Sequence, residues 1–142
     1  MEKPFVLLAD DNEATCTLIR ALLRPYYAVD VAMDGSEAIE KLKARQYSAI
    51  VLDLLMPVTD GYAVLDFLRH EQPDLLKTVL VITAAISPRE LARVETYPIA
   101  GLIRKPFDID ALLVAVRRIA GGSLLTSGVL LLLADFLRQR WL

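Results

Sequence analysis

The sequence predicts an α/β protein in which a five-stranded parallel sheet lies between two layers of helices. Short apolar runs alternate five times with longer segments whose apolar residues recur at helical spacing. This alternation implies right-handed crossovers and parallel strands, because each helix carries the chain back to the start of the next strand. With 142 residues, the chain is long enough to form one domain with a substantial buried core.

The first half of the chain contains three expected strands and two expected helices. Residues 5–9 and 49–53 are apolar runs of the kind found in strands buried on both faces. Residues 28–32 are apolar except for Asp30, which an edge strand can tolerate. The expected helices cover residues 13–24, capped by Asn12, and about 35–44, opened by Asp34.

The second half contains two more expected strands and three more expected helices. Residues 78–83 form an apolar strand that ends on a threonine, and residues 99–103 form a weaker one. Residues that accept hydrogen bonds from backbone amides mark the starts of the helices. These are Asp60 for a helix over 61–70, Ser87 with Pro88 for the fourth helix, and Asp108 for a fifth helix through Ile119.

Polar side chains follow four of the expected strands. They are Asp10 and Asp11 after the first, Asp53 at the end of the third, Thr83 at the end of the fourth, and Lys105 after the fifth. Because the carboxyl ends of parallel strands meet at the edge where such sheets bind ligands, these side chains should lie together. Three neighbouring carboxylates need a cation, and Mg²⁺ fits because it binds few carboxylates and keeps waters and phosphate oxygens.

Together these residues resemble the defining set of the receiver domain of two-component response regulators. The matching residues are Asp10-Asp11, Asp53, Leu55-Met56-Pro57, Gly61, Thr83-Ala84 and Lys105-Pro106-Phe107. The resemblance covers residues 4 to about 120 and implies a CheY-like, flavodoxin-like three-layer sandwich with strand order 2-1-3-4-5. It also implies a cis peptide bond before Pro106. We therefore expect residues 1–122 to form a receiver domain.

The resemblance implies that Asp53 accepts a phosphoryl group from a histidine kinase or a histidine phosphotransfer protein. It assigns Mg²⁺ to Asp10, Asp11, Asp53 and the backbone carbonyl of Leu55, and the phosphoryl group to Lys105, Thr83 and a pocket beside Ala84. Such a chain is a signalling phosphoacceptor rather than an enzyme, because it catalyses only its own phosphorylation and dephosphorylation. Its output would be contact with other proteins.

One position departs from the family. Receivers usually carry Tyr or Phe three positions before the lysine, whereas this chain has Leu102 there. An aliphatic side chain can repack but cannot swing a ring with a polar tip, so the usual aromatic switch is in doubt. A pseudo-receiver that is never phosphorylated and acts as an interaction or dimerisation module is the alternative function.

Rival classes fail on single residues. A flavodoxin-type nucleotide binder needs a hydroxyl-rich or glycine-rich loop after the first strand, where Asp10-Asp11 would repel phosphate. A dehalogenase-type phosphatase needs a second acid at the position of Leu55.

Cys16 is the only cysteine, so a reducing cytoplasm is the expected compartment. A net charge of −2 without a basic cluster argues against nucleic-acid binding.

Residues 123–142 extend beyond the receiver pattern, and no separate output domain is expected there. We predict an extra C-terminal helix, starting near residue 124 or 127, with an apolar run from Val129 to Leu133 that points around most of its circumference. The uncharged stretch is shorter than the roughly 20 residues that cross a bilayer, so a membrane anchor is not expected. We expect residues 124–142 to form a homodimer or partner surface, with packing on their own domain as the alternative.

Overall fold

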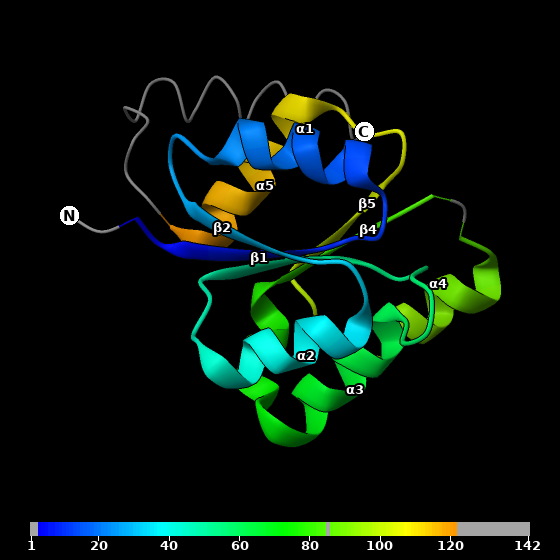
Figure 1. Ribbon diagram of the computed structural model, residues 1–142. Coiled ribbons are helices and arrows are strands. Elements are labelled where there is room, and N and C mark those ends of the chain that lie inside the picture. Colours follow the sequence, from blue (N-terminus) through cyan, green and yellow to red (C-terminus); the bar gives the residue numbers. More distant parts are fainter. Residues whose placement is uncertain (1–2, 85, 122–142) are drawn as a thin grey trace.

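The computed structural model describes residues 3–84 and 86–121 and contains a five-stranded parallel sheet (Figure 1). The strands are β1 (Phe5–Ala9), β2 (Ala28–Ala32), β3 (Ala49–Asp53), β4 (Val79–Thr83) and β5 (Gly101–Arg104). They lie in the order β2-β1-β3-β4-β5, which confirms the predicted fold class and strand order. The predicted C-terminal helix and the extension 123–142 lie outside the described residues.

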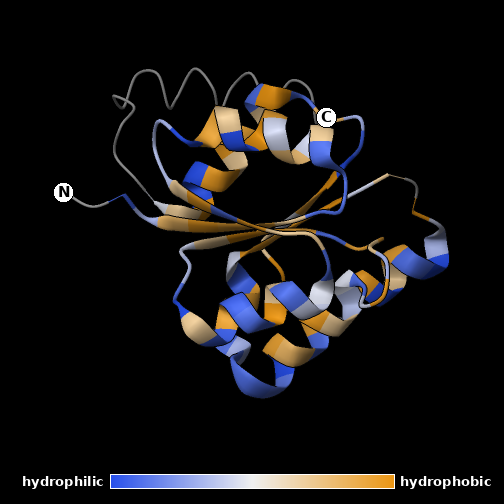
Figure 2. Cartoon of the chain, viewed as in Figure 1, coloured by the Kyte–Doolittle hydropathy of each residue, from blue (hydrophilic) through white to orange (hydrophobic). Residues whose placement is uncertain are grey.

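Helices cover both faces of the sheet, as expected for parallel strands joined by crossovers. In Figure 1, α1 (Glu13–Leu23) and α5 (Ile109–Ala120) lie on one face, and α2 (Gly35–Ala44), α3 (Gly61–Glu71) and α4 (Pro88–Glu95) lie on the other. Figure 2 shows the strands as an apolar layer through the middle of the molecule. Two core clusters form, one on each face, because alternate residues of each strand point to opposite sides.

Side-chain caps fix where the helices begin. The five residues predicted to cap or open helices all accept a hydrogen bond from a backbone amide of the first turn: Asn12, Asp34, Asp60, Ser87 and Asp108. At α4 the cap is reciprocal, because the Glu90 carboxylate also accepts from the backbone amide of Ser87. At α1, α3, α4 and α5, the cap fixes where the helix begins after a strand that has a polar residue at or just beyond its end.

Two strands have bounds that differ from the sequence prediction. Thr78 was expected to open the fourth strand, but it ends a short 3₁₀ helix, η1 (Pro73–Thr78), and its hydroxyl donates to the carbonyl of Leu75 at 2.6 Å. The fifth strand begins at Gly101 rather than Ile99. Leu76 of η1 and Ile99 contact the core although neither belongs to a strand, and a hydrophobic pattern alone cannot separate such residues from strand residues.

Two buried tyrosines near α4 differ in what their hydroxyls contact. The Tyr97 hydroxyl bonds to the carboxylate of Asp66. The Tyr62 hydroxyl is buried and finds no hydrogen-bond partner among the residues that the structure describes, while the guanidinium of Arg93 lies 3.7 Å from its ring centre. A buried hydroxyl without a partner loses its hydration for no return, so it destabilises the fold.

We therefore expect Tyr62→Phe to raise the melting temperature by roughly 3 °C, because about 1 kcal/mol of desolvation cost disappears. The matched control is Tyr97→Phe, which loses its bond to Asp66 and should melt at a lower temperature than the native chain. Scanning calorimetry of the three proteins measures both effects. A Tyr62→Phe variant that melts below the native chain would contradict the assignment of an unpartnered hydroxyl.

Candidate functional site

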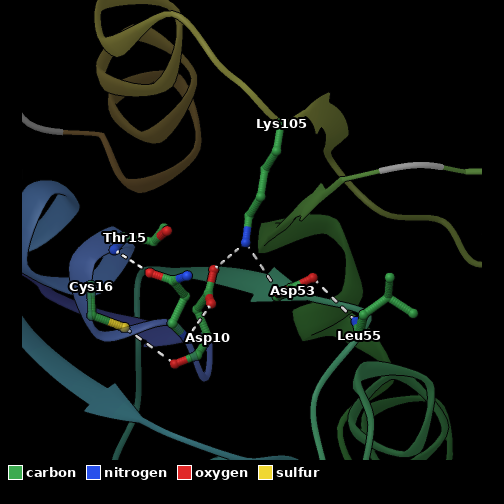
Figure 3. A network of polar contacts seen from close by, with 7 residues as sticks. Asp10, Thr15, Cys16, Asp53, Leu55 and Lys105 are labelled. Atoms are coloured by element: carbon green, nitrogen blue, oxygen red, sulfur yellow. Dashed lines mark hydrogen bonds and ion pairs between the residues drawn. The ribbon is translucent and has the colours of Figure 1, made fainter.

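The polar residues predicted from the strand ends meet at the carboxyl edge of the sheet (Figure 3). Asp10 follows β1, Asp53 is the last residue of β3 and Lys105 follows β5. Both aspartates are buried, with 0% and 4% of their surface exposed. Lys105 reaches across the strands between them, so its ammonium joins side chains that are 95 and 52 residues away in sequence.

Lys105 holds the two carboxylates together. Its Nζ lies 2.7 Å from Oδ2 of Asp10 and 3.1 Å from Oδ2 of Asp53. Its backbone amide donates to the carbonyl of Thr83 at 2.8 Å, which ties the residue to the end of β4. The peptide bond between Lys105 and Pro106 is cis, as the sequence predicted.

Asp53 is held by the backbone on both of its sides. Its Oδ1 accepts from the amide of Leu55 at 3.1 Å. Gly61, which begins α3, donates its amide to the carbonyl of Leu54 at 3.0 Å. A Cβ at Gly61 would lie 2.5 Å from the carbonyl oxygen of Asp53, so only glycine permits this approach. Hydrogen bonds from backbone amides therefore fix both the start and the end of the loop that follows Asp53.

Asp10 is fixed by the first turn of α1. Its Oδ1 accepts from the amide of Asn12 at 2.9 Å, and its backbone carbonyl accepts from the Cys16 thiol at 3.2 Å. Burial, aided by the charge of Asp10, raises the pKa of the Cys16 thiol to about 11, so the thiol keeps the proton that it donates. Sequence reasoning did not assign this role to Cys16, whose only signal was its helical position one turn after the cap.

The electrostatics of the site are dominated by burial. Burial raises the pKa of the Asp53 carboxyl, and the charge of Asp10 adds to this effect, while the amide of Leu55 and the ammonium of Lys105 offset it only in part. Burial lowers the pKa of Lys105, but its hydrogen bond to Asp10 and the charges of both aspartates outweigh this and raise it. The lysine is therefore a fixed positive charge.

A third carboxylate makes the site a candidate metal centre. Asp11 is exposed, and oxygen atoms of Asp10, Asp11 and Asp53 all lie within 4.8 Å of one another. Lys105 pairs with Asp10 and Asp53, and no other ion pair with these three carboxylates forms among the described residues, so negative charge is left unbalanced. Such a donor set, open to water on the side of Asp11, fits a hard divalent cation such as Mg²⁺, which keeps part of its hydration shell.

The remaining predicted residues lie around this centre. Thr83 is buried at the end of β4, and the exposed Ala84 follows it. The side chain of Leu55 is 53% exposed, and its backbone amide is the group that contacts Asp53. Leu102 is half-buried in β5 and packs against the core on the α2–α3–α4 face, in the place where receivers usually carry an aromatic ring.

Comparison with known proteins now identifies the class. Residues 6–117 match the family model of the response regulator receiver domain, so the chain belongs to this family of two-component signalling domains. It is 32% identical over 114 residues to hybrid signal transduction histidine kinase D of Dictyostelium discoideum, covering 80% of this chain and 7% of that protein. It is 31% identical over 124 residues to the transcriptional regulatory protein TcrA of Mycobacterium tuberculosis, covering 81% and 45%. The chain thus spans less than half the length of these relatives.

Solved structures agree with this assignment. A receiver domain of a Francisella response regulator has a TM-score of 0.73 at 28% identity, covering 83% of this chain and 97% of that chain. A receiver domain of a sensor histidine kinase from Pseudomonas aeruginosa has a TM-score of 0.74 at 26% identity, covering 84% and 98%, and carries a magnesium ion in its active-site cleft. Within the described ranges, no helix is long and apolar enough to cross a membrane.

The raised pKa of Asp53 predicts that this residue destabilises the metal-free protein. Asp53→Asn should raise the melting temperature in EDTA at pH 7 by roughly 2 to 5 °C, since it removes a buried charge beside Asp10 and leaves Lys105 paired. The gain should shrink as the pH falls through the pKa of Asp53, because the native side chain then becomes neutral too.

The control for this prediction is Asp11→Asn, which changes an exposed carboxylate and should have a smaller effect. Calorimetry at several pH values measures all three proteins. A variant at Asp53 that melts below the native chain at pH 7 would show that its ion pair with Lys105 outweighs the cost of burial.

Proposed function

We propose that this receiver accepts a phosphoryl group on Asp53 from a histidine kinase or a histidine phosphotransfer protein and signals through protein contacts. The observation that carries the proposal is the shared ammonium of Lys105, which lies within 3.1 Å of two buried carboxylates at the edge of the sheet. A buried carboxylate with a fixed cation beside it is equipped to attack phosphorus, because the cation remains close to the phosphoryl oxygens as they arrive.

Each residue has a defined part in this reaction. A carboxylate oxygen of Asp53 forms the new bond to phosphorus as the bond between phosphorus and the donor's histidine nitrogen breaks. The amide of Leu55 donates to Oδ1 of Asp53 and orients the carboxylate. Lys105 pairs with the incoming phosphoryl oxygens, the Thr83 hydroxyl donates to one of them, and the small side chain of Ala84 leaves room.

Mg²⁺ is the proposed cofactor. Asp10, Asp11, Asp53 and the backbone carbonyl of Leu55 would hold it, in keeping with the three carboxylates that lie within 4.8 Å of one another. The ion would neutralise charge on the phosphoryl group during transfer. This donor set supports the assignment because one lysine cannot balance three carboxylates and a phosphoryl group.

The setting that we infer is cytoplasmic, with protein partners rather than nucleic acid or membrane. A single cysteine, buried and reduced, suits a reducing compartment. The net charge of −2 does not favour a polyanion.

The decisive experiment is phosphorylation of the purified chain by acetyl phosphate with Mg²⁺. Intact-mass spectrometry should show the gain of one phosphoryl group, and Asp53→Asn should abolish it. The matched control is Asp60→Asn, an exposed acid on the same loop whose replacement still caps α3, and this variant should be modified like the native chain. A native chain that gains no mass would favour the non-phosphorylated pseudo-receiver instead.

The metal assignment predicts a stability change. Saturating Mg²⁺ should raise the melting temperature by several degrees, because an ion at 100 times its Kd stabilises the native state by about 2.7 kcal/mol. Asp11→Ala should remove most of this shift. Asp34→Asn, which changes an acid that caps α2, should retain it. A full shift in the Asp11 variant would place the ion elsewhere on the protein.

A further inference from the structure

The first turn of α1 places a thiol against the backbone of a proposed metal ligand. Cys16 has 6% of its surface exposed, and its Sγ donates a hydrogen bond to the carbonyl oxygen of Asp10 at 3.2 Å (Figure 3). This bond joins the start of α1 to the residue that follows β1. A thiol is a weak donor, so the importance of the bond depends on what the accepting carbonyl controls.

The carbonyl of Asp10 has no second partner among the residues that the structure describes. The amide of Asp10 donates to the carbonyl of Ala32 at 3.0 Å, and its carboxylate is held by the amide of Asn12 and the ammonium of Lys105. Asp10 has no exposed surface, so water does not reach the carbonyl oxygen in place of the thiol. Without Cys16, this buried oxygen would be left without a hydrogen bond.

The same carbonyl belongs to the peptide that joins two of the proposed Mg²⁺ ligands. Because a peptide unit is planar, the direction of the Asp10 carbonyl fixes the direction of the Asp11 amide. Asp11 is exposed and makes no hydrogen bond or ion pair of its own within the described part of the chain. The position of its carboxylate therefore depends on the orientation of this peptide.

Packing holds the thiol in place beside the carbonyl. Cys16 belongs to the core cluster on the α1–α5 face of the sheet, together with Leu8 of β1 and Ile19 of α1. Apolar neighbours therefore fix the Cys16 side chain whether or not the weak hydrogen bond forms. The peptide after Asp10 adapts to the thiol, rather than the thiol to the peptide.

We propose that Cys16 is a positioning residue for the Mg²⁺ site, which orients the peptide between Asp10 and Asp11 and so holds the Asp11 carboxylate beside that of Asp10. This inference rests on the metal assignment made under the proposed function. Cys16 does not itself contact the ion in this account. It raises the affinity because a ligand that is already in position loses less conformational entropy when the ion binds.

Titration calorimetry of Mg²⁺ binding to the full-length chain tests this role with a matched pair of variants. Serine and alanine fill nearly the same space, but only serine carries a hydrogen-bond donor. Cys16→Ser should bind Mg²⁺ within about twofold of the native affinity, whereas Cys16→Ala should bind it roughly tenfold more weakly. The control is Ile19→Val, which trims a buried side chain of the same core cluster and should leave the affinity unchanged.

Phosphorylation by acetyl phosphate provides a readout that a purely structural role of Cys16 would not change. In Cys16→Ala, the Mg²⁺ concentration that gives half of the maximal rate should rise about tenfold, while the rate at saturating Mg²⁺ should stay close to that of the native chain. If Cys16 contributed packing alone, Cys16→Ala and Ile19→Val would both melt at a lower temperature and keep the native dependence on Mg²⁺.

Three results would contradict the inference. Equal Mg²⁺ affinities of Cys16→Ser and Cys16→Ala would overturn it and leave the metal assignment intact. A weakening in Ile19→Val as large as that in Cys16→Ala would also overturn it, because the effect would then come from packing. A native chain that binds no Mg²⁺ would refute the metal assignment, and the inference together with it.

Discussion

The site depends on one ammonium group shared between two buried carboxylates. Asp10 and Asp53 come from neighbouring strands, and without Lys105 between them two desolvated negative charges would repel each other. The lysine reaches them because its own backbone is bonded to the end of β4. Three strands and the segment after a fourth must therefore all be in register before this charge balance exists. The charge balance of the site therefore forms only when the sheet is complete.

The site also carries more negative than positive charge. A lysine can balance one carboxylate fully, yet three carboxylates lie within 4.8 Å of one another. The surplus makes affinity for a divalent cation a direct consequence of the fold. In the proposed function, the arrival of a phosphoryl group would depend on that cation, since further negative charge could not otherwise be accommodated.

Much of this architecture could be predicted from the sequence because it is encoded locally. Strands that end on Asp53 or Thr83, and helices that begin after Asn12 or Ser87, carry their signals within a few residues. The features that escaped prediction arise only in three dimensions. η1 ends on Thr78, whose β-branched side chain would equally suit the strand that begins at the next residue. The Tyr62 hydroxyl and the Arg117 guanidinium, which have no hydrogen-bond partner among the described residues, are surrounded by neighbours that are remote in sequence. Hydrophobic spacing indicates that such residues are inside, but it cannot count their hydrogen bonds.

The close approach of Gly61 to Asp53 has a consequence for how such a domain can diversify. The loop begins after β3, and Gly61 at its end packs against the backbone of Asp53 and Leu54. The hydrogen bond that closes the loop, from the Gly61 amide to the Leu54 carbonyl, joins backbone atoms only. The exposed side chains on it, at Leu55, Pro57 and Val58, therefore have no part in holding the acid in place. Apart from Val58, whose φ of 64° restricts which residues it can accept, these side chains can change without disturbing the closure of the loop. The surface that a partner would contact can therefore vary separately from the position of the buried carboxylate, although both belong to one short loop.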